Sequence, residues 1–583
     1  MKTQFTKVDY SLSTLVDFIE LGTIGLPDIQ RPFIWKTPKV RDLFDSMYKG
    51  YPVGYLLFWE NALGNGGKQI GTNAKQKIPR LLIVDGQQRL TSLYAVLKGK
   101  PVIREDYTEQ KIVIAFRPTD ATFAVTDAAI SKDPEYISDI SQLWASDTSR
   151  TKFVEDFIAR LRKSRPVQEN ERYRLSEALD RLYDLKDYPF TALELVPSVG
   201  EEQVSDVFVR VNSAGITLNQ ADFILTLMSV FWDEGRSELE NFCRLSRIPS
   251  DTQASPYNHF IEPAPDQMLR VSVGLGFRRA RLRYVYSILR GKDLETEQFS
   301  EERRVQQFDI LKQSQAYVLD LQRWQDFLKA LLRAGFRSSA MISSQTAVLY
   351  SYVLYLIGKR DFRLEETILR DVIARWFFMT TLTMRYSATP ESQMEEDLNR
   401  LRGISSRDEF VRLLDGIVKD TLTEDFWNIT LPNDLATSSA RSPALFAYNA
   451  ALNLLGARVL FSKLKVSELL DPTIRAKKAP VERHHLFPKG YLKKVGIKDN
   501  KDINQIANFA YVEWQINIDI QDDPPPRYVP QHLKPYSVQE LEKMSYWHAL
   551  PKDWEHMDYL EFLGKRRKLI AQVVRDGFAE LER

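Results

Sequence analysis

The sequence has little of what would make it a disulfide-bonded or membrane-spanning protein. Cys243 is the only cysteine among 583 residues, which excludes an internal disulfide and a zinc site built from cysteine pairs. No run approaches the roughly 18 uninterrupted apolar residues of a membrane span. The first twenty residues lack the apolar core of a signal peptide. We therefore expect a protein of the reducing cytoplasm with no membrane partner.

The sequence also has almost no net charge. Lys+Arg number 80 and Asp+Glu 78, a formal charge of +2, so any nucleic-acid surface must be a local concentration of positive charge. Hydrophobic residues make up 44% and charged residues 27%, values typical of globular proteins, which excludes wholesale disorder. At roughly 100–200 residues per domain, the length predicts several domains.

Strand and helix patterns divide the chain into three regions. Short apolar or alternating runs predict strands at 81–84, 111–116 and 190–196, and TPKVRDLFDSMYKG predicts a helix over 37–50. Residues 270–430 are almost entirely helical in pattern, and a turn-rich break follows at 431–443. We predict a predominantly helical α+β multidomain protein. Its regions are an α/β head over 1–235, a helical coupling region over 236–430 and a C-terminal module over 431–583.

The most informative part of the head is LLIVDGQQRLTSLYAVLKGK, at 81–100. It predicts a strand, a tight turn and a helix, an arrangement that points backbone N–H groups and the positive helix end at an anion such as phosphate. The turn and first helical residues are Asp85, Gly86, Gln87, Gln88 and Arg89. Glycine permits close approach of a ligand, and amide and guanidinium groups donate to phosphate oxygens. No Walker A sequence occurs. A turn whose polar residues merely cap the helix is an equally good interpretation.

Two other segments of the head combine arginine with polar or aromatic residues. LPDIQRPFIWKTPKVRDLF places an arginine beside aromatic rings, which can clamp a phosphate and stack on a base. VSDVFVRVNSAGITLNQADFILTLM predicts two helices around a polar turn. The candidate ligand-binding residues are Gln30 and Arg31 in the first segment and Arg210 and Asn212 in the second. Taken alone, either segment is also explained by a structural role.

Together, IQRPFIW, VDGQQRL and FVRVNSAGITL resemble the ParB/sulfiredoxin-like N-terminal domain of the GmrSD family of modification-dependent (type IV) restriction enzymes. The resemblance implies binding and hydrolysis of a nucleoside triphosphate, with Asp85, Gln87, Gln88 and Arg89 at the nucleotide. Arg31, Arg210 and Asn212 would support them. It also implies a part in sensing modified DNA.

The C-terminal module has a concentration of histidine and positive charge. Two of the chain's six histidines are adjacent, His484 and His485, and residues 475–500 hold eight Lys/Arg against two acids. Such a cluster suits a phosphodiester backbone, which we expect Lys489, Lys493 and Lys494 to contact. Phosphodiester hydrolysis needs a base for water and a cation for the developing charge. Histidine suits the first role, and Mg²⁺ or Mn²⁺ with oxygen or mixed ligands suits the second.

The spacing of this module resembles the HNH-type (ββα-metal) nucleases. They place a metal-binding residue before a general-base histidine, then a proline, a bracing asparagine and a second asparagine nine positions further. HHLFP at 484–488, Asn508 and Asn517 match this pattern, also found in the C-terminal nuclease domain of the GmrSD family. By resemblance His485 is the base, His484 and Asn517 are metal ligands, and Asn508 is structural. Adjacent strand residues face opposite sides, so a shared site for both histidines would need a bulge.

Two arginine-rich segments of the middle region remain. GFRRARLRY at 276–284 is either a patch that faces DNA or a solvated helical face. TMRYSATPESQMEEDLNRLRG at 383–403 predicts a helix capped by Thr389 or Ser392, which we interpret mainly as a structural joint.

The sequence therefore predicts a nucleotide-regulated, metal-dependent DNA endonuclease or nickase that acts on modified phage DNA in bacterial defence. Its expected partners are DNA and a nucleoside triphosphate of unknown base, and a homodimer is compatible with the pattern. Two alternatives stay open. One is a nucleotide-switched DNA-binding protein without cleavage, and the other is an RNase or toxin with the same ββα-metal chemistry.

Overall fold

A computed structural model of the chain describes most residues and divides them into two units. The described residues are 3–25, 33–60, 80–104, 108–145, 149–199, 203, 207, 220–292, 296, 300–473 and 481–583. Unit 1 spans Met1–Ser237 and unit 2 spans Glu238–Arg583. The further division of unit 2 into a coupling region and a nuclease domain stays a prediction.

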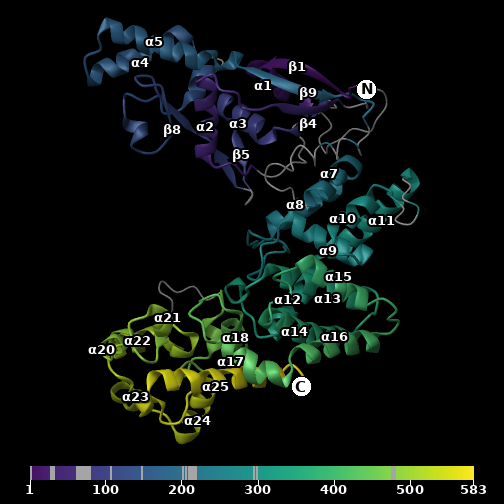
Figure 1. The fold of residues 1–583 in the computed structure, drawn as a ribbon, viewed down its shortest axis with the longest axis vertical. Coiled ribbons are helices and arrows are strands. Elements are labelled where there is room, and N and C mark those ends of the chain that lie inside the picture. The colour runs from purple at the N-terminus through teal and green to yellow at the C-terminus, as the bar shows by residue number, and fades with distance from the viewer. Residues whose placement is uncertain are drawn as a thin grey trace. The chain divides into compact units, whose positions relative to one another are not determined.

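Unit 1 is built on a five-stranded mixed sheet with the order β1-β9-β3-β4-β2 (Figure 1). Its strands are β1 (Phe5–Ser11), β2 (Ile24–Gly25), β3 (Leu56–Glu60), β4 (Leu81–Asp85) and β9 (Pro189–Leu195). β9 is antiparallel to β1 and parallel to β3, and β4 is antiparallel to β3. Two hairpins complete the strands of this unit: β5 (Pro101–Ile103) with β6 (Glu109–Lys111), and β7 (Ile114–Arg117) with β8 (Thr122–Val125).

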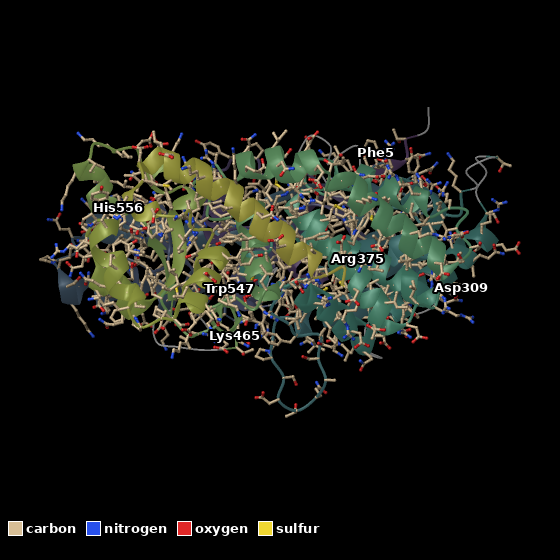
Figure 2. All side chains as sticks on the ribbon, turned by 90° about the horizontal axis from the view of Figure 1, so that it is seen from below. Phe5, Asp309, Arg375, Lys465, Trp547 and His556 are labelled. Atoms are coloured by element: carbon tan, nitrogen blue, oxygen red, sulfur yellow. The ribbon has the colours of Figure 1, made fainter. Side chains whose placement is uncertain are left out.

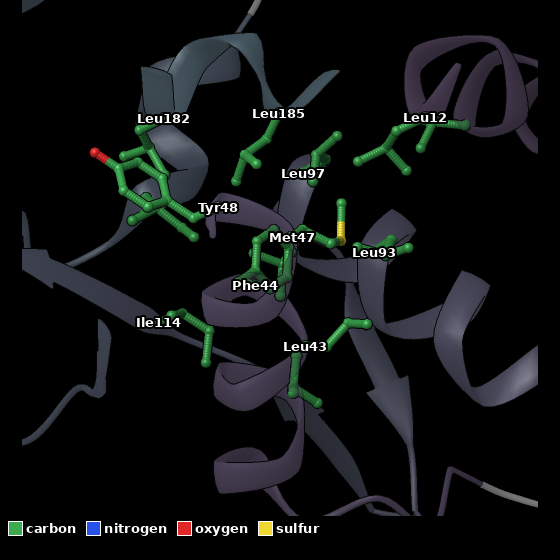
Figure 3. Packing of buried hydrophobic residues seen from close by; sticks show 14 of the residues in the cluster. Leu12, Leu43, Phe44, Met47, Tyr48, Leu93, Leu97, Ile114, Leu182 and Leu185 are labelled. Atoms are coloured by element: carbon green, nitrogen blue, oxygen red, sulfur yellow. The ribbon is translucent and has the colours of Figure 1, made fainter. Parts of the chain in front are cut away.

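The described helices of unit 1, apart from α7, bury their apolar faces in one core. The helices are α1 (Leu12–Glu20), α2 (Thr37–Tyr48), α3 (Gln87–Leu97), α4 (Arg150–Ser164), α5 (Glu169–Tyr183) and α7 (Gln220–Phe231). Ser11 caps α1, and Pro38 stands in the first turn of α2, where its missing N–H costs nothing. Figure 3 shows Leu43, Phe44 and Met47 of α2 among the buried leucines of the neighbouring helices. Their spacing places them on one helical face.

The predicted elements of the head are confirmed with one correction. Helix 37–50 is α2, strand 81–84 is β4 and strand 190–196 is β9. The single strand expected at 111–116 is wrong, because β6 ends at Lys111 and β7 begins at Ile114 in another hairpin. Continuous apolar patterns do not reveal where a strand changes its partner.

Unit 2 is mainly helical, as predicted for 270–430. Its larger helices after the boundary helix α8 (Asp233–Leu245) are α9 (Pro265–Phe277), α10 (Leu282–Leu289), α11 (Glu301–Val318), α12 (Leu321–Arg333), α13 (Gln345–Arg360), α14 (Glu366–Leu382), α15 (Pro390–Arg400), α16 (Arg407–Thr421) and α18 (Pro443–Leu454). Towards the C-terminus follow α20 (Lys489–Lys494), α22 (Trp514–Ile520), α23 (Pro525–Leu533), α24 (Val538–Trp547) and α25 (Tyr559–Ala579). The turn-rich break expected at 431–443 begins with a helical turn, α17 (Leu431–Asp434).

The last helix, α25, ties the end of the chain to the middle of unit 2. It packs closely on α18, since a Cβ atom on Gly577 would lie 2.5 Å from Cβ of Ala451. Arg375 of α14, labelled in Figure 2, donates to the carbonyl of Leu581 at 3.0 Å and pairs with Asp415 at 2.9 Å. Among the described residues, no helix combines the length and the apolar character needed to cross a membrane.

Candidate functional site

The DGQQR segment forms the expected strand, turn and helix. β4 ends at Asp85, and α3 begins at Gln87. Gly86 between them has φ +99°, in the left-handed region. A Cβ atom at this position would lie 2.4 Å from Cδ2 of the buried Leu56, so both the backbone conformation and the packing require glycine here.

Arg89 holds this turn against a neighbouring loop. Its guanidinium donates to the carbonyl of Val53 at 2.8 Å and to Oδ2 of Asp85 at 3.2 Å. Burial lowers the pKa of Arg89, and the charge of Asp85 opposes that shift. The guanidinium also lies against Gly54, where a Cβ atom would be 2.6 Å from Nη1. Arg89 therefore stabilises the turn through internal contacts, and its place at a nucleotide stays a prediction.

Gln88 joins the first two motifs of the head. Its Oε1 accepts a hydrogen bond from the backbone N–H of Ile34 at 3.1 Å. Arg104 holds the same segment by donating to the carbonyl of Trp35 at 2.6 Å. Gln87 is partly exposed, and its side chain makes no hydrogen bond with a described residue. Gln30, Arg31, Arg210 and Asn212 lie outside the described residues, so their predicted part in the site is untested.

Of the C-terminal motif residues, His484 and His485 lie on β10, Asn508 directly precedes β11, and Asn517 lies on α22. β10 (Val481–His485) pairs antiparallel with β11 (Phe509–Glu513), and α22 begins directly after β11. The register is regular, with His484 opposite Ala510 and His485 opposite Phe509. Because the pairing has no bulge, the two histidines point to opposite faces of the strand.

His484 points into the interior and meets α22. Only 3% of the residue is exposed, and its Nδ1 lies 2.8 Å from Oδ1 of Asn517. Burial lowers the pKa of His484 to about 4, so its ring is neutral at neutral pH. Nε2 is buried and has no hydrogen-bond partner, and the ring packs edge-on against Tyr528. Because Oδ1 of Asn517 can only accept, Nδ1 carries the proton of the neutral ring and the lone pair is on the buried Nε2.

His485 lies on the other face and is partly exposed. Its Nε2 is 2.9 Å from Oδ1 of Asn504, and its ring packs on Phe509 with centroids 4.4 Å apart. Burial lowers the pKa of His485, and the positive charges of Lys489 and Arg483 lower it further. Because Asn504 Oδ1 can only accept, Nε2 carries the proton of the neutral ring and the basic lone pair is on Nδ1.

Asn508 holds the loop that leaves β10. It is fully buried, accepts from the N–H of Phe487 at 2.9 Å and donates to the Phe487 carbonyl at 3.1 Å. Its Nδ2 also donates to the carbonyl of Ile503 at 3.0 Å. One amide thus fixes both the HHLFP loop and the segment that carries Asn504. This geometry gives Asn508 contacts with backbone only, which is a positioning role.

The three lysines predicted to bind DNA lie on α20, the short helix after Pro488. Lys489, Lys493 and Lys494 are exposed, and none forms an ion pair with a described carboxylate. The helix is anchored by Asp522, whose Oδ1 accepts from the N–H of Gly490 at 2.9 Å. A Cβ atom on Gly490 would collide with this carboxylate at 2.0 Å, so glycine permits the contact.

Sequence reasoning missed three residues that contact this site. Asn504 binds His485, Tyr528 packs on His484 and donates to the Leu486 carbonyl at 2.6 Å, and His532 contributes to the lowered pKa of His484. Tyr528 ends the run PPRY at 525–528, which could have drawn attention to it, whereas no spacing rule points to the other two. Within the described parts of the chain, no group of three or more His, Cys, Asp or Glu side chains could hold a metal ion.

Comparison with known proteins supports part of this interpretation. Residues 12–229 match the family model described as GmrSD restriction endonuclease, N-terminal domain. This match likens the head of the chain to the N-terminal domain of a restriction endonuclease family. The chain is also 22% identical over 567 residues to an uncharacterized protein of Methanocaldococcus jannaschii, which covers 91% of this chain and 88% of the relative.

Proposed function

We propose that the chain is a divalent-metal-dependent DNA endonuclease or nickase that cuts modified foreign (phage) DNA under control of a nucleoside triphosphate. The observation that carries the proposal is the pairing of two adjacent histidines of β10 with two asparagines, one on α22 and one in the segment between β10 and β11. His484 binds Asn517 at 2.8 Å, and His485 binds Asn504 at 2.9 Å. The match of residues 12–229 to a restriction endonuclease domain supports DNA as the substrate.

His485 is the general base of the proposed reaction. Its lowered pKa keeps the ring neutral at neutral pH, and the contact with Asn504 leaves the lone pair on Nδ1. Nδ1 takes a proton from a water molecule while the water oxygen bonds to phosphorus. The bond from phosphorus to the leaving oxygen then breaks, which yields two DNA ends.

His484 and Asn517 would hold a divalent cation, Mg²⁺ or Mn²⁺. Nδ1 donates to Oδ1 of Asn517 at 2.8 Å, so these two atoms could share an ion only after the ring proton moves to Nε2 and the ion takes the place of the hydrogen bond. Burial keeps the ring of His484 neutral, which is the form that can bind a cation. Two protein ligands leave places for water and phosphate, as Mg²⁺ prefers. Because His484 and His485 face opposite sides of β10, the end of this strand would have to rearrange on DNA binding for an ion at His484 to reach the phosphate attacked at His485. In that arrangement the ion would stabilise the charge that develops on the leaving oxygen.

The exposed lysines of α20 would bind the DNA backbone beside the base. Lys489 lies close enough for its charge to lower the pKa of His485, so a phosphate at Lys489 would be near that ring. Lys493 and Lys494 extend the positive surface along the same short helix.

The head would bind a nucleoside triphosphate at the DGQQR turn and control cleavage. The helix start at Gln87 offers free backbone N–H groups to an anion, and the Gln87 side chain has no internal hydrogen bond within the described residues. The proposal predicts that triphosphate changes the rate of DNA cleavage and that Gln87→Ala weakens this response. Arg89→Ala should do the same, but it also removes the contacts with Val53 and Asp85.

The decisive experiment is a digestion panel. Purified full-length protein is incubated with modified phage DNA, unmodified DNA and RNA, with Mg²⁺, Mn²⁺ or EDTA, and with or without each triphosphate. We expect metal-dependent nicking of modified DNA that His485→Ala abolishes and that His556→Ala, a change at an exposed histidine, preserves. DNA binding without cutting would favour the nucleotide-switched binding protein. Preferential cutting of RNA would favour an RNase or toxin.

A further inference from the structure

A cavity of about 820 Å³ lies in unit 2, outside the elements that carry the paired histidines. It is formed where α10 and α15 begin. We call it the arginine cavity, and its lining includes Arg279, Arg281, Tyr284, Lys292 and Ser392. The segment 276–284 is therefore not a continuous helical face. α9 ends at Phe277, Arg278 adopts a left-handed φ of +54°, and α10 starts at Leu282.

The acidic residues of the arginine cavity are already neutralised by other contacts. Glu395 accepts from Arg279 at 2.7 Å and from the backbone N–H of Ala280 at 2.6 Å. Glu396 pairs with Arg400 at 2.6 Å. Among the described residues, neither of these carboxylates is left to balance a further cation.

Two further guanidinium groups belong to this region: Arg281 lines the cavity, and Arg283 lies two residues further along α10, outside the lining. Arg281 donates to the hydroxyl of Ser392 at 3.2 Å, and Arg283 donates to the hydroxyl of Tyr284 at 2.9 Å. Within the described residues, neither arginine forms an ion pair with a carboxylate. Hydrogen bonds from Arg283 and Arg281 also lower the pKa of Tyr284, as expected in a positive electrostatic potential. A hydroxyl partner orients a guanidinium and leaves its charge available.

The start of α15 adds a second positive feature to the same cavity. α15 has 11 residues and begins at Pro390, and the side chain of its N-cap, Thr389, makes no capping hydrogen bond. Ser392 in the first turn binds Arg281. The positive end of a helix therefore lies beside the guanidinium groups, an arrangement that favours an anion.

We propose that the arginine cavity binds phosphate groups of the DNA backbone through Arg281 and Arg283. Guanidinium groups pair with phosphate oxygens through two parallel hydrogen bonds, and hydroxyls of Tyr284 and Ser392 hold them in place. Arg283 is exposed while Arg281 is partly buried, so the two arginines lead from the protein surface into the cavity. A strand with successive phosphates fits this arrangement. The choice of DNA rests on the proposed function, whereas the phosphate chemistry rests on the cavity alone.

The test is DNA binding by the full-length chain that carries His485→Ala, so that the DNA stays intact. Fluorescence anisotropy measures the affinity for a labelled duplex over a series of salt concentrations. We expect Arg281→Gln with Arg283→Gln to weaken binding about tenfold and to reduce the salt slope by about 1–2. The matched double change to lysine should retain most of the affinity. Arg407→Gln removes a surface arginine whose side chain is 62% exposed and should have no effect.

Unchanged affinity and salt slope in a double glutamine variant with unchanged Tm would overturn the inference. Calorimetry with ATP separates the two sources of phosphate. If the variant loses ATP binding and keeps its affinity for DNA, the ligand is a free nucleotide and the DNA assignment is wrong.

Cleavage assays separate this inference from the proposed function. The double glutamine change is tested there with His485 intact. If the double glutamine variant keeps its DNA affinity and its nicking depends on His485, the inference about the arginine cavity is wrong and the proposed function stands. If the variant binds DNA more weakly but nicking does not depend on His485, the assignment of the catalytic site is wrong and the inference about the arginine cavity stands.

Discussion

The Nδ1 atom of His484 lies 2.8 Å from Oδ1 of Asn517, and this contact joins the first strand of the C-terminal hairpin to the helix that follows the second strand. Burial keeps His484 neutral, so Nδ1 donates to the amide oxygen, and a cation could take the place of that proton if the proton moved to Nε2. The pair therefore combines a structural contact with the chemistry of a metal ligand set.

Removal of Asn517 should reduce metal-dependent activity more than stability. We expect Asn517→Ala to lower nicking on the order of 10–100-fold at limiting Mg²⁺, with partial recovery at high Mg²⁺ or Mn²⁺, because one ligand is lost. Gln515→Ala on the same helix removes only an exposed hydrogen bond to Asp519 and serves as the control. The measurement is the initial nicking rate against metal concentration. An Asn517→Ala protein with unchanged metal dependence would contradict the ligand assignment.

Asn504 should act through the orientation of His485. Asn504→Leu removes the acceptor for Nε2–H, so the proton can move to Nδ1 and the base is lost in part of the molecules. We expect kcat to fall about tenfold or more with little change in KM, since a general base contributes about 10²–10⁴-fold. Asn504→Asp keeps an acceptor and should retain most of the activity. Equal losses for leucine and aspartate would indicate a role other than positioning.

Much of this arrangement could be predicted from the sequence, and the reasons are local. The strand-turn-helix at DGQQR follows from an apolar run, a glycine and helical periodicity, all within neighbouring residues. The opposite orientation of His484 and His485 follows from the period of a strand. The contact between His485 and Asn504 does not, because it depends on how the loop of 486–508 folds back. Arg89 looked like a phosphate donor, but its long side chain is used internally between Val53 and Asp85.

Acid should destabilise unit 2 through histidines that are buried in the neutral form. His548 is 1% exposed, donates from Nε2 to the carbonyl of Arg458 at 2.9 Å, and burial lowers its pKa to about 4. The unfolded chain binds this proton near pH 6.5 and the folded chain only near pH 4. The stability contribution is therefore fully present above about pH 6.5 and is lost as the pH falls towards 4.

At pH 5 the loss attributable to His548 is about 2 kcal/mol. His548→Gln retains a donor near the position of Nε2 and does not titrate. We expect it to flatten the decline of the unit 2 unfolding free energy between pH 6.5 and 5, measured by denaturant titration. His556→Gln, at an exposed position, is the matched control and should leave the pH dependence unchanged. Parallel curves for the His548→Gln protein and the unmodified chain would show that His548 is not the group responsible.

Gly86 should be more sensitive to substitution than a glycine that needs only its positive φ. Gly22 has φ +71° and open space where a Cβ atom would stand, so Gly22→Ala should cost about 1–2 kcal/mol from backbone strain. Gly86→Ala meets the same kind of strain and also pushes a methyl group against Leu56 at 2.4 Å, which adds about 1–3 kcal/mol. Thermal unfolding of unit 1 measures both changes. If the two variants lose the same stability, the side chain of Leu56 can move aside at no cost in free energy. The packing of β3 on the DGQQR turn would then not constrain the shape of the proposed nucleotide site.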